Sequence, residues 1–106
     1  MDYTCDNWVV LFFDGDVPHY KLLVGTSGGY TQGDSWRMNS GIVSVTDAGD
    51  YYLFYGYSGS VYRCGKKAYA LRMNNYGIYE QLKTKFGDKI SLLPETTKWT
   101  KMDWLL

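Results

Sequence analysis

The longest uninterrupted run of apolar residues in this chain is only six residues long, from Trp8 to Phe13. Its β-branched and aromatic residues favour a buried strand, whereas a helix that crosses a bilayer needs about 20 apolar residues. Turn-forming residues follow at 14–16, and the second run, His19–Val24, predicts the returning strand of a hairpin. The sequence therefore favours short strands joined by tight turns, and no membrane association.

The same spacing continues to residue 64. Further strands are expected at residues 42–46, 51–57 and 61–64, because turn residues separate them at 47–50 and 58–60. The segment from Gly25 to Gly33 holds four glycines, which predicts a loop or a strongly bent backbone. Residues 34–41 fit neither a helix nor a strand clearly.

After residue 65 the pattern changes to that of a helix. Asn74 or Asn75 can cap a helix of about residues 75–86, whose apolar stripe consists of Ile78, Leu82 and Phe86. A final strand is expected at 88–93. We therefore expect one α+β domain over residues 1–106, with five to six strands in a strongly bent antiparallel sheet or small half-barrel.

The tail after residue 94 carries Trp99, Met102 and Trp104. Apolar side chains of this size are unfavourable in water, so the tail should pack on the body of the domain or on a second copy. For this reason we expect a homo-oligomer.

The charges are balanced overall but uneven along the chain. The formal net charge is zero, with −5 over residues 1–60 and +5 over residues 61–106. Nucleic acid is an unfavoured partner, because duplex binders usually need a basic face. One compact basic run stands out, formed by Arg63, Lys66, Lys67 and Arg72.

Catalytic and metal-binding patterns are weak. Cys5, His19 and Cys64 are scattered, and a zinc site needs four ligands. No histidine is tied to a serine by spacing, and several of the acids belong to turns, so we expect neither an enzyme nor a cofactor. The polar N-terminal residues do not suggest a signal peptide, which favours free thiols in a reducing compartment.

The aromatic content is unusual, at 18% of the chain with 11 Tyr and 4 Trp. Trp36 could stack on a base while Arg37 meets a phosphate, and Gly/Ser loops offer N–H and hydroxyl donors. Core packing, tight turns and solvated charges are the simpler explanations for the same residues. The candidate ligand-binding residues are Gly28, Gly29, Tyr30, Trp36, Arg37, Tyr55, Tyr57, Ser58, Gly59, Ser60, Arg63 and Lys66.

Five segments are distinctive together, at 28–30, 33–42, 55–64, 85–90 and 99–104. Through them, over roughly residues 20 to 104, the chain resembles a group of small proteins without assigned activity from tailed bacteriophages, including phages of cyanobacteria. The resemblance implies an accessory protein that acts in the cytoplasm of the bacterial host. It implies no functional residues.

Two non-enzymatic functions fit these observations. The first is sequestration of a nucleotide second messenger of host immunity, which needs stacking rings, backbone donors and a few bases. The alternative is a protein inhibitor of a host enzyme or defence complex, of the anti-CRISPR or host-takeover kind, which needs Tyr, Trp and Met anchors. We favour the first, and place a structural virion protein third.

Overall fold

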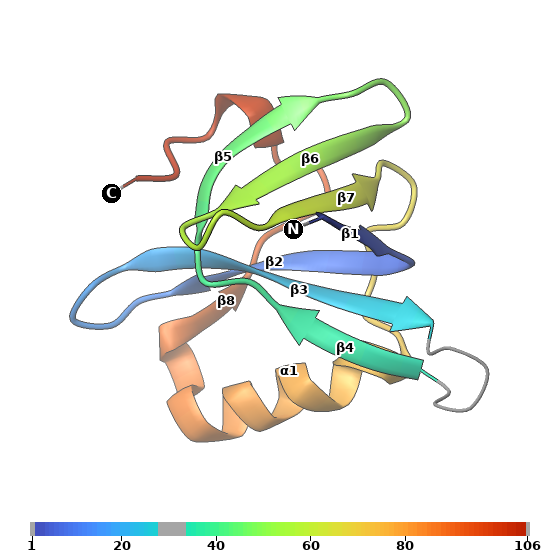
Figure 1. Ribbon diagram of the computed structural model, residues 1–106. Coiled ribbons are helices and arrows are strands. Elements are labelled where there is room, and N and C mark those ends of the chain that lie inside the picture. The colour runs from blue at the N-terminus through green and yellow to red at the C-terminus, as the bar shows by residue number, and fades with distance from the viewer. Residues whose placement is uncertain (1, 28–33, 106) are drawn as a thin grey trace.

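Two four-stranded sheets face each other, and one helix covers the far side of the second sheet (Figure 1). This computed structural model describes residues 2–27 and 34–105, so the predictions for Gly28, Gly29 and Tyr30 lie outside it. Sheet A has the order β1-β7-β6-β5 and sheet B the order β4-β3-β2-β8. The predicted α+β class is confirmed.

The strand bounds show what the sequence prediction missed. Sheet A consists of β1 (Asp2–Cys5), β7 (Val61–Gly65), β6 (Tyr51–Gly56) and β5 (Ile42–Asp47). Sheet B consists of β4 (Asp34–Met38), β3 (His19–Ser27), β2 (Asn7–Phe13) and β8 (Ile90–Leu92). The expectation of five to six strands in one bent sheet or half-barrel is therefore wrong, since the described residues form eight strands in two sheets that do not close into a barrel.

Strand β2 is buried on both faces, which explains its continuous apolar run. Trp8 and Val10 point into the core between the sheets, whereas Val9 and Leu11 point into a second core under the helix. The side chains of a strand alternate between faces, so only a strand covered on both sides needs apolar residues at every position.

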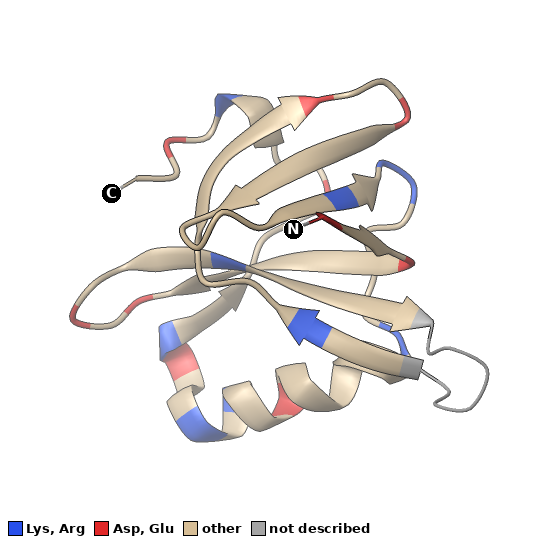
Figure 2. Cartoon of the chain, in the orientation of Figure 1, with Lys and Arg blue, Asp and Glu red and all other residues tan. Residues whose placement is uncertain are grey.

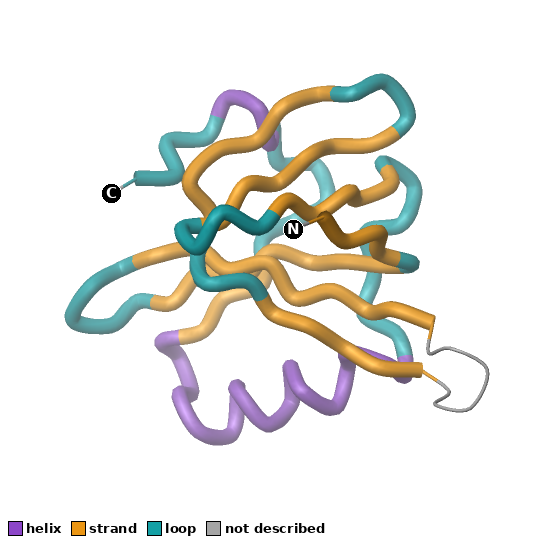
Figure 3. The backbone as a smooth tube through the Cα atoms, in the orientation of Figure 1, coloured by secondary structure: helices purple, strands orange, loops and turns teal. Residues whose placement is uncertain are grey.

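The chain passes directly from a strand of one sheet to a strand of the other at two corners, at residue 6 and at residues 39–41, and it crosses a third time, back to sheet B, through α1 (Figure 3). At the second corner the Oδ1 atom of buried Asn39 accepts a 2.8 Å hydrogen bond from the Leu22 amide, and the Asn39 amide donates to the Leu22 carbonyl. Asn39 thereby continues the pairing of β3 beyond the end of β4. The ambiguous segment 34–41 is therefore a strand followed by a corner.

Helix α1 (Met73–Phe86) starts two residues earlier than predicted. Arg72 precedes it as the cap, and Asn75 lies inside its first turn, where its Oδ1 atom accepts a 2.8 Å hydrogen bond from the Arg72 amide. Ile78 and Leu82 pack against the core under the helix, as predicted. The placement of Phe86 in the same stripe is wrong, because its side chain is 39% exposed at the end of α1. The short 3-10 helix η1 (Gly87–Lys89) then leads into β8.

The C-terminal segment completes the core between the sheets, and its short 3-10 helix η2 (Trp99–Lys101) packs against β5. Trp99 and Trp104 are buried, with parallel rings 6.3 Å apart, and both contact Phe54. The Trp104 Nε1–H donates to the Trp99 carbonyl at 3.1 Å. Of the two expected positions for the tail, packing on the body of its own domain is the one observed.

No helix in the described part of the chain combines the length and the apolar content that crossing a membrane requires. Acidic and basic residues occur in both sheets and around the helix rather than on two separate halves (Figure 2). The topology explains this mixing, because β1 from the acidic half of the sequence pairs with β7 from the basic half.

Candidate functional site

The predicted ligand-binding residues do not form one cluster. Trp36 and Arg37 are neighbours on β4, so their side chains point to opposite faces of sheet B. Trp36 is 46% exposed, and the Arg37 guanidinium lies over the Tyr3 ring, 4.2 Å from its centroid. The structure therefore does not bring these two side chains to one ligand.

Serine hydroxyl groups hold the turn from Tyr57 to Ser60, and one of them, on Ser40, comes from the corner at residues 39–41. The Ser58 amide donates to Ser40 Oγ at 3.0 Å, and Ser58 Oγ lies 3.2 Å from Ser60 Oγ. Gly59 has a φ of +89°, which the tight turn requires. These bonds give the predicted turn residues a structural role.

Tyr57 and Tyr55 also lie apart from the predicted basic residues. The Tyr57 ring covers Gly41, where an added Cβ atom would lie 2.6 Å from the ring. Tyr55 pairs with Val61 at the start of β7, whereas Lys66 follows the end of that strand. The two tyrosines and Lys66 are therefore at opposite ends of sheet A.

A different group of residues does converge, at the end of sheet A where the β5–β6 turn meets the segment after β7. Together they line a cleft of about 440 Å³. We call this the basic cleft, lined by Gly49, Asp50, Gly65, Lys66, Lys67 and Ala68.

Local sequence explains how the two segments meet. Gly49 turns the chain with a φ of +92°, and its amide donates to Asp47 Oδ1 at 2.9 Å. The Lys66 amide donates to the Asp50 carbonyl at 3.1 Å, and Lys66 Nζ lies 2.8 Å from both Asp47 carboxylate oxygens. These contacts connect the turn to the end of β7.

The cations at the basic cleft differ in whether they form an ion pair with a carboxylate. The hydrogen bond from Lys66 lowers the pKa of Asp47, and the same bond raises the pKa of Lys66. Lys66–Asp47 is the only ion pair among the described residues, so Arg63 and Lys67 have no carboxylate partner there. These two cations are available to an anionic ligand.

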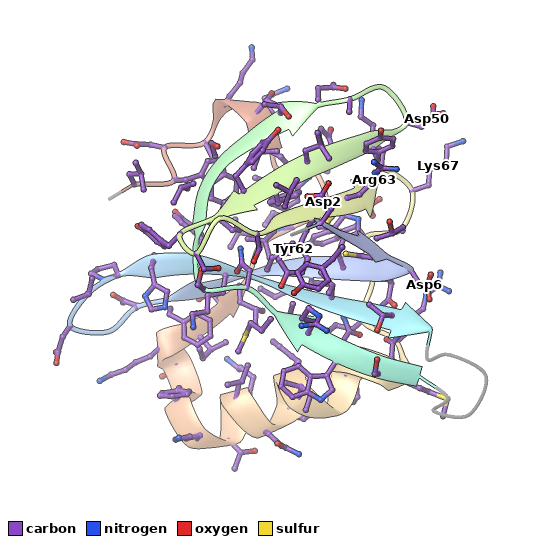
Figure 4. All side chains as sticks on the ribbon, in the orientation of Figure 1. Asp2, Asp6, Asp50, Tyr62, Arg63 and Lys67 are labelled. Atoms are coloured by element: carbon purple, nitrogen blue, oxygen red, sulfur yellow. The ribbon has the colours of Figure 1, made fainter. Side chains whose placement is uncertain are left out.

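Arg63 lies beside the cleft, where its side chain packs over an aromatic ring. Its guanidinium lies 4.8 Å from the centroid of the Tyr51 ring, next in sequence to Asp50. Figure 4 shows Arg63, Asp50 and Lys67 at the same corner of sheet A. The site thus combines a guanidinium–ring contact with two lysines.

Of the residues predicted to bind a ligand, Arg63 and Lys66 lie at this site. Asp50, Tyr51 and Lys67 also lie there, but they were not among the predicted ligand-binding residues. Lys67 was visible as part of the basic run of the sequence. Asp50 and Tyr51 could be found only by knowing which turn packs beside residues 65–68.

In residues 2–27 and 34–105, no group of three or more His, Cys, Asp or Glu could hold a metal ion. Cys5 and Cys64 pair in register on adjacent strands as buried free thiols. Burial raises the pKa of Cys64 well above its ordinary value. This cysteine pair has the character of core residues.

No protein-family model, no curated protein and no solved structure matches this chain.

Proposed function

We propose that the basic cleft binds a nucleotide, a small anion that carries a flat ring. The observation that carries the proposal is a pair of cations without an acidic partner, Arg63 and Lys67, beside a cleft of about 440 Å³. Ligand pockets in proteins usually enclose roughly 300–1,000 Å³.

Each part of the ligand has a suitable partner. The Arg63 guanidinium, which lies over the Tyr51 ring, would also stack on a base, because guanidinium planes stack on bases. Lys66 and Lys67 can meet phosphate oxygens as point charges. Because Asp47 already neutralises Lys66, we assign most of the phosphate contact to Lys67 and Arg63.

The biological role proposed with this site is that of a phage accessory protein in the host cytoplasm. Such a protein would sequester a nucleotide second messenger of host defence without converting it. Sequestration requires affinity and no catalytic group, which fits a cleft lined by Lys66 and Lys67 with a stacked arginine beside it.

Calorimetric titration against cyclic mononucleotides, cyclic dinucleotides and cyclic ADP-ribose isomers tests the proposal. We expect one of these to bind, and Lys67→Ala and Arg63→Ala each to weaken it about tenfold or more, since hydrogen bonds to charged groups contribute about 1.5–3 kcal/mol. Lys85→Ala, on the helix at the far side of sheet B, is the matched control. Absence of heat with every nucleotide, or an equal loss in Lys85→Ala, would contradict the site.

The second candidate is a protein inhibitor, favoured by exposed apolar side chains on β4 and the start of α1. Trp36 is 46% exposed, Met73 94% and Tyr76 49%, and α1 packs against β4. A host protein retained by the intact chain but not by Trp36→Ala would favour this function. Self-association is also still a prediction, which sedimentation at two concentrations tests.

A further inference from the structure

A second cavity, of about 380 Å³, opens where the β2–β3 hairpin meets the end of α1. Its floor is apolar and aromatic. Phe13 at the end of β2 meets Phe86 edge to face, with ring centroids 6.1 Å apart, and Ile90 at the start of β8 is buried beside them. The cavity lies on the helix side of sheet B, away from the basic cleft.

The walls of this cavity leave apolar surface in water. Val17 on the hairpin loop is 76% exposed and Phe86 is 39% exposed. His19 stacks on Phe13 at 5.1 Å with nearly parallel rings, and its Nδ1 atom lies 2.8 Å from the Val17 carbonyl. These contacts preform the cavity, so a ligand that covers its walls removes apolar surface from water.

The rim of the cavity carries charges of both signs on different segments. Asp14 and Asp16 come from the hairpin loop, whereas Lys21 comes from β3 and Lys89 from η1. Figure 2 shows acidic colour on that loop and basic colour on β3 and beyond the end of α1. None of these four side chains forms an ion pair with another described residue.

We propose that this cavity binds a zwitterionic apolar α-amino acid, with phenylalanine as the simplest example. Its ammonium group would face Asp14 and Asp16, and its carboxylate would face Lys21 and Lys89. Its side chain would pack on Phe13 and Phe86, where edge-to-face or offset ring contacts are favourable. A zwitterion offers an opposite charge to all four rim residues. A simple carboxylic acid would leave the two aspartates without an opposite charge, and a simple amine would leave the two lysines without one.

NMR titration of the full-length chain with three small molecules tests the assignment. The probes are L-phenylalanine, N-acetyl-L-phenylalanine, which lacks the ammonium charge, and phenethylamine, which lacks the carboxylate. We expect L-phenylalanine to shift the amide signals of residues 13–21 and 86–90, and each of the other two to bind about tenfold more weakly or worse. Equal binding by either of the two, or no shift with about 10 mM L-phenylalanine, would overturn the proposal.

Variants separate the two charged contacts. Asp16→Asn should weaken L-phenylalanine and leave N-acetyl-L-phenylalanine unchanged, because the acetylated molecule has no ammonium group to lose a partner. Lys21→Gln should weaken L-phenylalanine and leave phenethylamine unchanged. The opposite pattern, or no effect of either substitution on L-phenylalanine, would overturn the assignment.

Phe86→Ala removes part of the floor and should abolish the shifts. Tyr76→Ala is the matched control, since Tyr76 is a similarly exposed aromatic residue on the same helix, outside the cavity. Loss of binding in Tyr76→Ala as well would contradict the site. If Phe86→Ala disturbs folding, Asp16→Asn on the exposed loop still decides the outcome. Nucleotide binding at the basic cleft is measured separately and does not depend on this result.

Discussion

At the scale of single residues, the side chains of three buried asparagines form hydrogen bonds with backbone groups outside the regular strand and helix pairing. Asn7, Asn39 and Asn75 are at most 4% exposed. The Asn7 side-chain amide donates to Asn75 Oδ1 at 3.1 Å, joining the start of β2 to the start of α1 across 68 residues of sequence. The sequence suggested Asn75 as a helix cap, but its long-range partner depends on the fold and could not be predicted from local pattern.

Asn75→Ala should lower the free energy of unfolding by about 1–3 kcal/mol. The substitution removes the acceptor of the part-buried Arg72 amide and one of the two acceptors of the buried Asn7 side-chain amide, which keeps only its bond to the Ala70 carbonyl. Urea unfolding measures the loss. Gln81→Ala, exposed on the same helix, is the control and should change stability by no more than about 0.5 kcal/mol. Equal losses in the two variants would contradict this role.

Tyr69 predicts a dependence of stability on alkaline pH. Its hydroxyl donates to the Leu93 carbonyl and accepts from the Val10 amide, and burial raises its pKa to about 12. The unfolded chain has a tyrosine pKa of about 10. The folded state therefore holds the proton more tightly, so this stabilisation is complete below pH 10 and is lost between about pH 10 and 12.

Urea unfolding at several pH values, with absorbance of the ionised phenol, measures this effect. Tyr69→Phe should reduce the loss of stability over that interval and remove the highest-pKa tyrosine from the titration. Unchanged pH dependence in Tyr69→Phe would show that another group is responsible.

At the scale of elements, local pattern predicted the hairpins and the helix but not the sheet corners. β2 was recognisable because every position after Asn7 is apolar, and the β5–β6 turn because of its Asp and Gly residues. β1 is only four residues long and pairs in parallel with β7, so its strand character comes from a distant partner. The basic cleft was half visible for the same reason: Arg63 and Lys66 are in one run, but Asp50 and Tyr51 reach it through tertiary pairing.

The two ends of the α1 stripe should differ in their contribution to stability. Leu82→Ala should cost about 2 kcal/mol, the low end for a leucine, because Leu82 packs against the core but is only half-buried. Phe86→Ala should cost less, although phenylalanine is larger, because 39% of its side chain is already in water. Urea unfolding of both variants compares them. A greater loss in Phe86→Ala would mean that the end of α1 is buried in solution.

At the scale of the whole molecule, the C-terminal tryptophans are part of the core rather than an attachment to it. Trp99 contacts Trp8 and Tyr69, and Trp104 contacts Tyr20 and Phe54. The sequence predicted that this tail must be covered. The sequence could not show whether the tail packs on its own chain or on a second copy. An apolar pattern indicates that a residue is buried, but it does not identify the surface that buries it.

Deletion of residues 99–106 should unfold the domain. Replacing one buried Trp by Ala typically costs about 3–5 kcal/mol, and most domains have only about 5–15 kcal/mol in total. Circular dichroism and thermal unfolding measure the result. Deletion of residues 105–106 alone is the control and should leave the fold intact, since Leu105 is 55% exposed. A cooperative transition in the longer deletion would contradict a core role for the tail.

The parallel pairing of β1 with β7 also fixes an order of events during synthesis. Residues 2–5 emerge from the ribosome about sixty residues before their partners at 61–64. Trp99 and Trp104 emerge later still, so the space between the sheets stays open until both have been synthesised. Pairing of distant segments is slow, because chain entropy is lost before the contacts form. We therefore expect the fold to be completed only after Trp104 has emerged, and shorter intermediates to expose unpaired strand edges on which copies can aggregate.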